Sequence, residues 1–384
     1  KVFPEVKDLV VKLMEEDYGN PSSLHQKGLD AGHYIKETKE ILAKEWKVDS
    51  KEIVLTSGGT ESNNLALIGA ALANKRSGNR IITSKVEHAS VSSTMAFLES
   101  LGFEVVYLNV DHQGIVDLEQ LEQEVNEDTI LVSVMYVNNE IGAVEPIQEI
   151  AEIIKEKNPK TLFHVDAIQA FGKYHIYPKR MGIDLMSVSG HKIHGPKGTG
   201  ALFIKNRTKV KPIIYGGGQQ DGMRSGTENV PGIVGIGTAT KRAIATMEER
   251  TAKEREMRDY LIKRVTEEVP FTRVNGSRTN RLPNNVNFAF QFIEGESLLI
   301  KLDMAGICGS SGSACTSGSL DPSHVLLAIG LPHEIAHGSL RLTLSEENTM
   351  EEMDYVVEQI KEIVSYLRGM SPLYEDYMRR TKEK

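Results

Sequence analysis

The chain has 384 residues, 40% of them hydrophobic, so it can bury the cores of two domains and is too long for one compact module. Its 53 Asp and Glu residues outnumber its 45 Lys and Arg residues, and the formal charge of -8 argues against direct binding of nucleic acid. No apolar run approaches the roughly 20 residues of a membrane helix, and 2 cysteines form no disulfide framework, so we expect a cytoplasmic protein that does not bind membranes.

Residues 1–205 begin with an amphipathic helix and continue with short strands. The helix is predicted by apolar residues at helical spacing, which are Val6, Leu9, Val10, Leu13 and Met14. It ends at the turn-forming residues Gly19, Asn20 and Pro21. Seven β-branched runs follow, mostly separated by helix-length segments: 52–57, 80–84, 103–108, 129–135, 162–166, 184–189 and 200–205. This alternation predicts an α/β fold with a mostly parallel sheet, and the apolar strands predict helices on both sheet faces.

Polar motifs stand where these strands end. They read GGTESNN, VEHAS, NNEIG, DAIQ and GHK in chain order. In an open α/β sheet, ligands bind outside the carboxyl ends of the strands. We therefore expect the functional site at that edge of the sheet.

The chain changes character after a Gly-rich loop at residues 215–232. A long helical stretch runs to about Pro270, and the runs NNVNFAF and SLRLTLS then alternate as half-exposed antiparallel strands do. Further helices are expected near residues 295–305, 323–330 and 350–369, which together predict a smaller α+β domain. We assign residues 19–250 to the large domain, residues 1–18 and 251–384 to the small domain, and the charged end EDYMRRTKEK to a frayed tail.

Three features suggest cofactor chemistry, although two of them also have an ordinary structural explanation. Lys192 follows a strand in SVSGHKIHGPKG, where a desolvated lysine can form a Schiff base with an aldehyde cofactor; on spacing alone, a surface lysine is the better explanation. Asp166 ends the apolar strand LFHVD, where a carboxylate needs a cationic partner such as a protonated pyridine nitrogen. The motif SGGTES places Thr60 at a helix start that can bind phosphate, or can simply form an N-cap.

Taken together in this order, the motifs resemble the class V branch of the fold-type I pyridoxal-phosphate enzymes, and most closely the cysteine desulfurases of the NifS/IscS kind. The resemblance runs from GNPSS at residue 19 to GSLRLTLS at residue 345. It is carried by TSGGTESNN, NNEIG, HVDAIQ, SGHKIHGPKG, GGGQQDGMRSGTENVPG and SSGSACTSGS. It implies a large domain with a mostly parallel seven-stranded sheet covered by helices, followed by a smaller α+β domain.

The resemblance implies roles around the ring of pyridoxal 5'-phosphate. Lys192 would hold the cofactor as a Schiff base and later move the Cα proton of the substrate. Asp166 would keep the pyridine nitrogen protonated, so that the ring accepts electrons. His88 would stack on the ring and shuttle protons, although alone it is better explained as a structural histidine. Gln169 and Asn139 would bind the phenolic oxygen side of the ring.

The resemblance also implies how the phosphate and the substrate are bound. The phosphate would contact Gly59, Thr60, Ser189 and His191, together with Thr227 from a second copy of the chain, which implies a homodimer. Arg341 would bind the carboxylate of L-cysteine through a bidentate pair, with Asn139 nearby. Without the family pattern, an arginine on a half-exposed strand is simply solvated.

Cys315 stands in CGSSGSACTSGS, a segment whose small residues are poorly suited to packing a thiol. The resemblance implies that Cys315 attacks the sulfur of the cofactor-bound substrate, leaving alanine and a persulfide. Sulfur then passes to a separate acceptor such as an iron-sulfur scaffold, and a transient role of Cys315 as a cluster ligand stays open. Cys308, which ends LDMAGIC, is expected to be a small buried hydrophobe.

The sequence PHEIAH matches the HExxH zinc pattern from His333 to His337. Pro332 precedes the motif and Gly338 follows it, so the helix is expected to be barely more than one turn long. We interpret the match as fortuitous and assign no metal site.

Other functions stay open at this point. The chain is also compatible with a selenocysteine lyase or another class V aminotransferase or lyase, and Cys315 argues only against a transaminase, which needs no thiol. A sulfur-delivery docking hub without catalysis is a third possibility, against which the presence of Lys192 and Asp166 argues. Members of this family begin with a strand and a DNAATT-like loop, whereas this sequence starts later, at Lys1; whether that segment is absent or only omitted also stays open.

Overall fold

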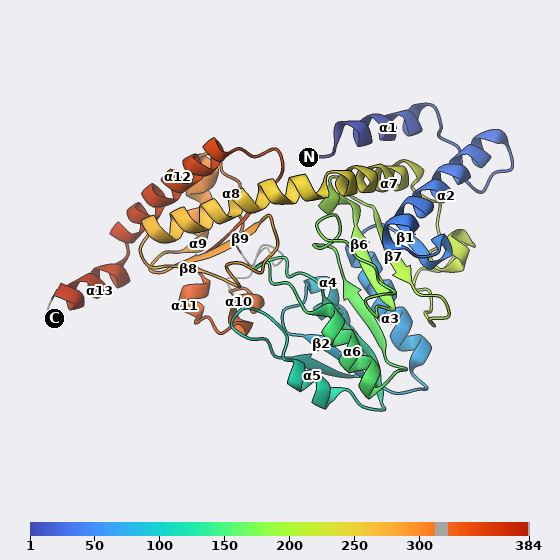
Figure 1. The fold of residues 1–384 in the computed structure, drawn as a ribbon, viewed down its shortest axis with the longest axis horizontal. Coiled ribbons are helices and arrows are strands. Elements are labelled where there is room, and N and C mark those ends of the chain that lie inside the picture. The colour runs from blue at the N-terminus through green and yellow to red at the C-terminus, as the bar shows by residue number, and fades with distance from the viewer. Residues whose placement is uncertain (312–321, 383–384) are drawn as a thin grey trace. The chain divides into compact units, whose positions relative to one another are not determined.

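The described residues form two compact units. The computed structural model describes residues 1–311 and 322–382. Unit 1 comprises Lys1–Leu108, Asp117–Val137 and Glu145–Met247, and unit 2 comprises the described parts of Asn109–Val116, Asn138–Val144 and Glu248–Lys384 (Figure 1). Residues 1–18 belong to unit 1, which corrects their expected assignment to the smaller domain. The physical reason is that helix α1 (Pro4–Glu15) packs against helix α7 (Val230–Ala245).

A seven-stranded sheet forms the centre of unit 1. Its strands are β1 (Ile53–Thr56), β2 (Arg80–Ser84), β3 (Glu104–Leu108), β4 (Thr129–Met135), β5 (Leu162–Asp166), β6 (Leu185–Ser189) and β7 (Gly200–Ile204). They lie in the order β1-β7-β6-β5-β4-β2-β3, and only β7 pairs antiparallel with its neighbours. The other six strands therefore run in one direction and end at the same edge of the sheet.

Helices lie around this sheet, with α1 packed on α7. In chain order they are α1, α2 (Gln26–Trp46), α3 (Gly59–Asn74), α4 (Ala89–Ser100), α5 (Leu118–Glu124), α6 (Ile147–Lys157) and α7, with the 3-10 turns η1 (Ser50–Glu52), η2 (Gly190–Ile193) and η3 (Gln219–Gly222). Helix α3 contacts β1 and all four strands from β4 to β7. Strands β4 to β7 are buried at nearly every position, as expected for a sheet covered on both faces.

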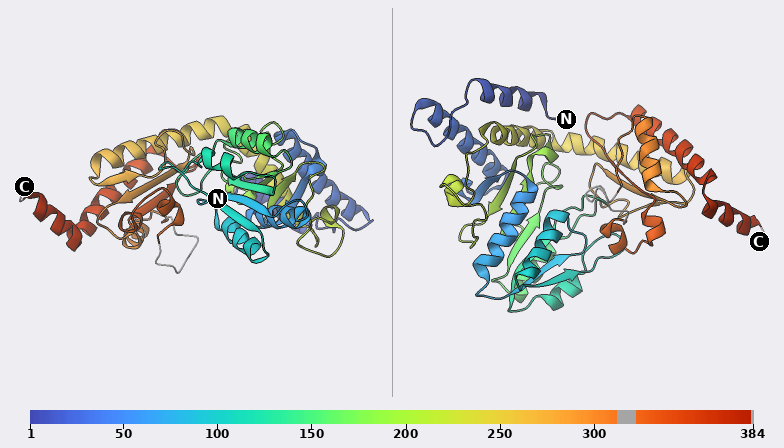
Figure 2. Two further views of the ribbon diagram at one scale, coloured as in Figure 1. Left: turned by 90° about the horizontal axis from the view of Figure 1, so that it is seen from below. Right: turned by 180° about the vertical axis from the view of Figure 1, so that it is seen from behind.

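Unit 2 contains a smaller antiparallel sheet covered by long helices. Its strands are β8 (Thr272–Val274), β9 (Asn285–Phe290) and β10 (Ser339–Thr343), in the order β10-β9-β8. Its helices are α8 (Met247–Glu268, whose first residue belongs to unit 1), α9 (Gly295–Met304), α10 (His324–Ala328), α11 (His333–Ala336), α12 (Met350–Gly369) and α13 (Pro372–Lys382). Residues of α8 (yellow) and α12 (red) bury the apolar face of the sheet around Phe288 and Phe290 (Figure 2).

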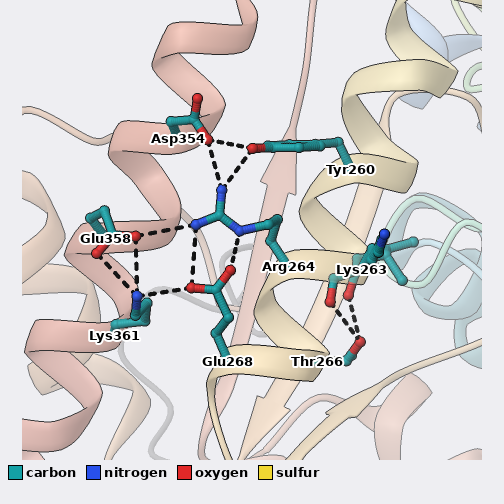
Figure 3. Close-up of polar contacts among 9 residues, drawn as sticks. Tyr260, Lys263, Arg264, Thr266, Glu268, Asp354, Glu358 and Lys361 are labelled. Atoms are coloured by element: carbon teal, nitrogen blue, oxygen red, sulfur yellow. Dashed lines mark hydrogen bonds and ion pairs between the residues drawn. The ribbon is translucent and has the colours of Figure 1, made fainter.

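Charged side chains join α8 to α12 at the surface of unit 2. Arg264 of α8 forms ion pairs with two residues of α12, 2.8 Å from Asp354 and 3.2 Å from Glu358 (Figure 3). Glu268 of α8 pairs with Arg264 and with Lys361. Because these side chains are partly exposed, water and salt screen the pairs, and we attribute the helix packing mainly to the apolar core beneath them.

Two expectations about unit 2 were wrong. The charged C-terminal segment is helical as far as Lys382, because α13 places Tyr374 and Tyr377 against Phe271 and Phe292, with ring centroids 5.2 to 6.3 Å apart. Cys308 is exposed instead of buried, since it lies beyond the turn at Gly306 that ends α9. Within residues 1–311 and 322–382, no helix combines the length and the apolar character needed to cross a membrane.

Candidate active site

Most of the predicted site residues of unit 1 lie at one edge of its sheet. Gly59 and Thr60 follow β1, His88 follows β2, Asp166 ends β5 and Ser189 ends β6. Gln169, His191 and Lys192 come within a few residues of the last two strands. Because β1, β2, β5 and β6 run in one direction, the structure brings these residues to the same edge.

The start of α3 is built to approach a ligand closely. Gly58 precedes the helix at φ 151°, a backbone conformation that favours glycine. A Cβ atom on Gly59 would lie 2.1 Å from Cδ1 of Ile168, so a larger residue there would require the Ile168 side chain to move. No side chain in the described part of unit 1 caps this helix, which leaves its first N–H groups available to an anion and disfavours the N-cap explanation.

Asp166 is a buried carboxylate that two donors orient. Its Oδ1 accepts from the backbone N–H of Ile168 at 3.0 Å, and its Oδ2 accepts from Nδ2 of Asn63 at 2.8 Å. Burial raises the pKa of Asp166, while the positive charges of His88 and Lys192 oppose that rise. A cation placed against Asp166 would stabilise its ionised form, so this group fits the protonated pyridine nitrogen of pyridoxal phosphate.

His88 is the N-cap of α4. Its Nδ1 accepts from the backbone N–H of Ser90 at 3.1 Å and lies 2.8 Å from the Ser90 hydroxyl. A backbone N–H can only donate, so neutral His88 must carry its proton on Nε2. The half-buried ring is thereby held in one tautomer, and Nε2 is the atom that can exchange a proton with a bound substrate.

Lys192 and His191 lie on the short turn η2. Ser189, which is buried at the end of β6, is 2.8 Å from Nδ1 of His191 through its hydroxyl. Both His191 and Lys192 are exposed. The desolvated lysine expected from the sequence is therefore not found in unit 1, because η2 is at its surface.

Gln169 and Thr227 occupy loops beside this edge. Gln169 is half-buried in the turn that follows Asp166, and Thr227 is exposed in the Gly-rich loop. Arg224 of this loop forms a bidentate pair with Glu61 in the first turn of α3, at 2.8 and 3.2 Å. The loop that carries Thr227 is thus attached to the helix start that is available to phosphate.

Two buried titratable groups beneath the edge were missed in the sequence. Oε1 of Glu87 accepts from the Ser84 hydroxyl at 2.7 Å and from the backbone N–H of Met135 at 3.0 Å. Burial, helped by the negative charge of Asp166, raises the pKa of Glu87 to about 8, so Glu87 is mainly a neutral acid at pH 7. Burial likewise lowers the pKa of His164 to about 3 and keeps it neutral.

Arg341 and Asn139 belong to unit 2, where they contact each other. Nη1 of Arg341 donates to the backbone oxygen of Asn139 at 3.0 Å, and Nη2 donates to the Ser310 hydroxyl at 3.3 Å. The backbones of Ser310 and Arg341 also form an antiparallel bridge. Half-buried Arg341 is therefore held in place by hydrogen bonds and is not simply a solvated strand residue.

Glu140, next to Asn139, was not singled out in the sequence. It is 5% exposed, and its carboxylate accepts a hydrogen bond from Ser323, the N-cap of α10. Burial raises the pKa of Glu140, an effect opposed by the Ser323 hydroxyl and the positive charges of His324 and Arg341. Cys315 lies outside the described residues. Among the described residues that flank it in sequence, Ser310 accepts a hydrogen bond from Arg341 and Ser323 donates one to Glu140.

Asn63, which was not singled out in the sequence, could have been found from the helical periodicity of α3. The buried face of α3 repeats at helical spacing and includes Gly59, Ser62, Asn63, Ala66, Leu67 and Ala70. An asparagine on such an apolar face needs hydrogen-bond partners from elsewhere in the fold. For Glu140 and Ser323 we find no comparable local signal, because their contact spans 183 residues of sequence.

Comparisons with known proteins identify the family of this chain. The family Aminotransferase class-V matches residues 1–356. A protein of Clostridium botulinum (strain Hall) named cysteine desulfurase IscS is 50% identical over 383 residues, covering 99% of this chain and 96% of that protein, and one of Dictyoglomus turgidum with the same name is 47% identical over 97% of this chain and 94% of that protein. Among solved structures, a NifS-like protein superposes with a TM-score of 0.90 at 38% identity, covering 96% of this chain and 97% of that one. A NifS-like protein of Rickettsia africae superposes with a TM-score of 0.85 at 32% identity, covering 95% and 96%.

Proposed function

The chain belongs to the Aminotransferase class-V family and, within it, to the cysteine desulfurases, and we propose that it removes sulfur from L-cysteine with pyridoxal 5'-phosphate as its cofactor. Asp166 carries the cofactor proposal, because a buried carboxylate at the carboxyl edge of the sheet suits a cationic ring nitrogen. The uncapped start of α3 at the same edge suits the phosphate.

The family resemblance supports a set of cofactor contacts for the residues described above. Its phosphate would bind the N–H groups at Gly59 and Thr60, with Ser189 and His191, and its ring would contact Asp166, His88 and Gln169, with Asn139 on the phenolic oxygen side. Lys192 would attach it covalently. When bound, pyridoxal phosphate supplies an electron sink for bonds broken at the substrate.

The protein's own groups would carry the remaining steps. Arg341 would bind the substrate carboxylate through its planar guanidinium, with Asn139 beside it. Nζ of Lys192 would take the proton from the substrate Cα, and Nε2 of His88 would exchange a second proton at the substrate. Because Nδ1 of His88 accepts from Ser90, the neutral ring carries its proton on Nε2, and the proposal assigns the exchange to that atom.

Cys315 would take the sulfur atom. Its thiolate attacks the sulfur of L-cysteine, the bond from Cβ to sulfur breaks, and an S–S bond forms, so that L-cysteine and a thiol become L-alanine and a persulfide. Two cysteines in 384 residues suit a reducing compartment, where this thiol stays available, and we place the protein in the cytoplasm. The persulfide sulfur would pass to an acceptor protein such as an iron-sulfur scaffold, as the name IscS of the relatives suggests.

We further propose that the active protein is a homodimer. Thr227 is exposed in a loop that Arg224 attaches to the start of α3. In this proposal, Thr227 of each copy completes the phosphate site of the other. Sedimentation of the holoenzyme tests the dimer, and a monomer with full activity would contradict it.

Two substitutions test the function. Cys315→Ala is expected to abolish persulfide and sulfide production from L-cysteine while leaving the visible absorption of the bound cofactor unchanged. Lys192→Ala is expected to prevent borohydride from fixing the cofactor to the chain. Full turnover by Cys315→Ala, or a keto acid product in place of alanine, would favour another class V activity. Faster turnover of selenocysteine than of cysteine would favour a selenocysteine lyase. No turnover by the unaltered protein would favour the docking hub.

A further inference from the structure

Asn63 connects the two side chains of unit 1 that are assigned to the cofactor ring. Its Nδ2 donates to Oδ2 of Asp166 at 2.8 Å and to the Ser90 hydroxyl at 2.9 Å. The same hydroxyl lies 2.8 Å from Nδ1 of His88. Asp166, Asn63, Ser90 and His88 therefore form one chain of hydrogen bonds, contributed by β5, α3, the first turn of α4 and its N-cap.

We propose that Asn63 and Ser90 are positioning residues that hold Asp166 and His88 in the orientations the cofactor requires. The proposal rests on the function proposed above. Neither residue is assigned a contact with substrate or cofactor; both act through the residues they bond.

The chemistry of the amide explains why asparagine is suited to position 63. A primary amide nitrogen presents two protons from one planar atom without a net charge, and here one proton is directed to Asp166 and the other to Ser90. Together with the backbone N–H of Ile168, Asn63 gives each oxygen of Asp166 one fixed donor. Without Asn63, only the Ile168 N–H would orient the carboxylate, which would then be less well fixed about its Cβ–Cγ bond.

The chain also fixes the tautomer of His88. The Ser90 hydroxyl accepts from Asn63, so its own proton is free to point toward Nδ1 of His88, where the backbone N–H of Ser90 already donates. Both donors require Nδ1 to be unprotonated. Because Asn63 is fully buried and Ser90 is 8% exposed, water cannot readily replace either partner.

A purely structural role for Asn63 predicts a different result. In that case removing the amide would lower stability without changing how the cofactor is bound. Asn74, at the other end of α3, is a matched control because its Nδ2 also donates twice, to the backbone oxygens of Ala70 and Lys209. Asn74→Ala therefore removes the same group and the same number of hydrogen bonds away from the site.

The experiment compares Asn63→Ala, Ser90→Ala, the double variant and Asn74→Ala with the unaltered protein. We expect Asn63→Ala to weaken binding of pyridoxal phosphate to the apoprotein about tenfold and to lower kcat about tenfold at an unchanged KM. Asn74→Ala should leave all three quantities unchanged. If the chain acts as a unit, the double variant loses no more than Asn63→Ala alone; independent residues would lose about a hundredfold.

Further outcomes decide the matter if Asn63→Ala fails to fold, as thermal unfolding would reveal. Ser90→Ala should then weaken cofactor binding, and Ser90→Thr, which keeps the hydroxyl, should restore it. Three results would overturn the proposal. The first is that Ser90→Ala and Ser90→Thr bind the cofactor equally, and the second is that Asn63→Ala and Asn74→Ala do so. The third is that the losses of the two single variants multiply in the double variant. If the unaltered protein itself binds no pyridoxal phosphate and forms no persulfide, the proposed function has failed instead.

Discussion

The site residues of unit 1 and those of unit 2 are held by different kinds of structure. In unit 1, Asp166, His88 and Ser189 extend from the ends of buried strands or from the start of a helix. In unit 2, Asn139 and Glu140 lie in a short segment without regular structure. The backbone of that segment is fixed by side chains, because Asn285 and Asn287 donate to the Glu140 oxygen at 3.2 and 3.0 Å.

Arg281 shows how far unit 2 depends on such contacts. Its buried guanidinium donates to the backbone oxygens of Asn275, Ser277, Ile141 and Asn285, at 3.0 to 3.2 Å. Burial lowers the pKa of Arg281 to about 10, an effect reinforced by the positive charge of Arg258. We conclude that substitution of a strand-end site residue in unit 1, such as Asp166, changes mainly chemistry, whereas substitution of a polar residue that fixes the Asn139–Glu140 segment in unit 2 also changes the backbone.

The largest effect is expected from Asp166→Asn in unit 1. The amide cannot supply the negative charge that a protonated ring nitrogen needs, so kcat should fall about 1000-fold or more. Stability of the apoprotein should change little, because two effects oppose each other: the variant removes a buried carboxyl whose pKa burial raises, but its amide nitrogen cannot accept from one of the two donors, Ile168 N–H or Asn63 Nδ2. Steady-state kinetics and urea unfolding measure the two quantities, and a variant that unfolds readily would contradict the stated contrast between the units.

Arg281→Met in unit 2 is expected to do the opposite. The substitution leaves several buried carbonyl groups without a donor, which should lower the free energy of unfolding by about 3 to 5 kcal/mol. Urea denaturation followed by circular dichroism measures this loss. Exposed Arg278, three residues away, provides the matched control, and Arg278→Met should unfold like the unaltered protein.

Glu87→Gln is expected to change how the free energy of unfolding depends on pH. The pKa of Glu87 is about 8 in the fold against an ordinary value of 4.5, so the folded chain retains a proton that the unfolded chain has lost between these values. The stability contributed by the neutral acid is complete below about pH 4.5 and is lost progressively as the pH rises to about 8, at about 1.4 kcal/mol per pH unit.

Glutamine carries no such charge, so Glu87→Gln should be more stable than the unaltered protein by about 3 kcal/mol at pH 7. The difference should be small at pH 4.5 and stop growing above about pH 8. Denaturation at several pH values measures it. A constant difference across this range would show that Glu87 does not keep its proton in the fold.

Glu140→Gln is expected to have the smallest effect. The amide keeps the size of the side chain but weakens the bond from Ser323, so the end of the segment that carries Cys315 should be less well fixed. We expect persulfide formation to slow about tenfold while the cofactor dissociation constant stays the same. Ser323→Ala should have the same effect, and a large loss of cofactor in either variant would contradict this division of labour.

Much of the fold is predictable from short stretches of sequence. All seven predicted strands of the large sheet occur within one residue of their expected ends, and NNVNFAF and SLRLTLS pair antiparallel as expected. These features depend on local patterns, namely β-branched runs and helical spacing of apolar residues. The motif residues after the strands were also predictable as a group, because parallel strands end at a common edge.

The sequence alone therefore determined the strands of the large sheet and which polar residues end them. Only the tertiary structure decided three sets of hydrogen bonds. Asn63 donates to Asp166 and Ser90, the backbone N–H of Met135 donates to Glu87, and the Ser323 hydroxyl donates to Glu140. The tertiary structure also decided that α1 belongs to unit 1 and that α13 is helical. These contacts join residues far apart in the chain, and they depend on strand order and helix packing, which no local pattern specifies.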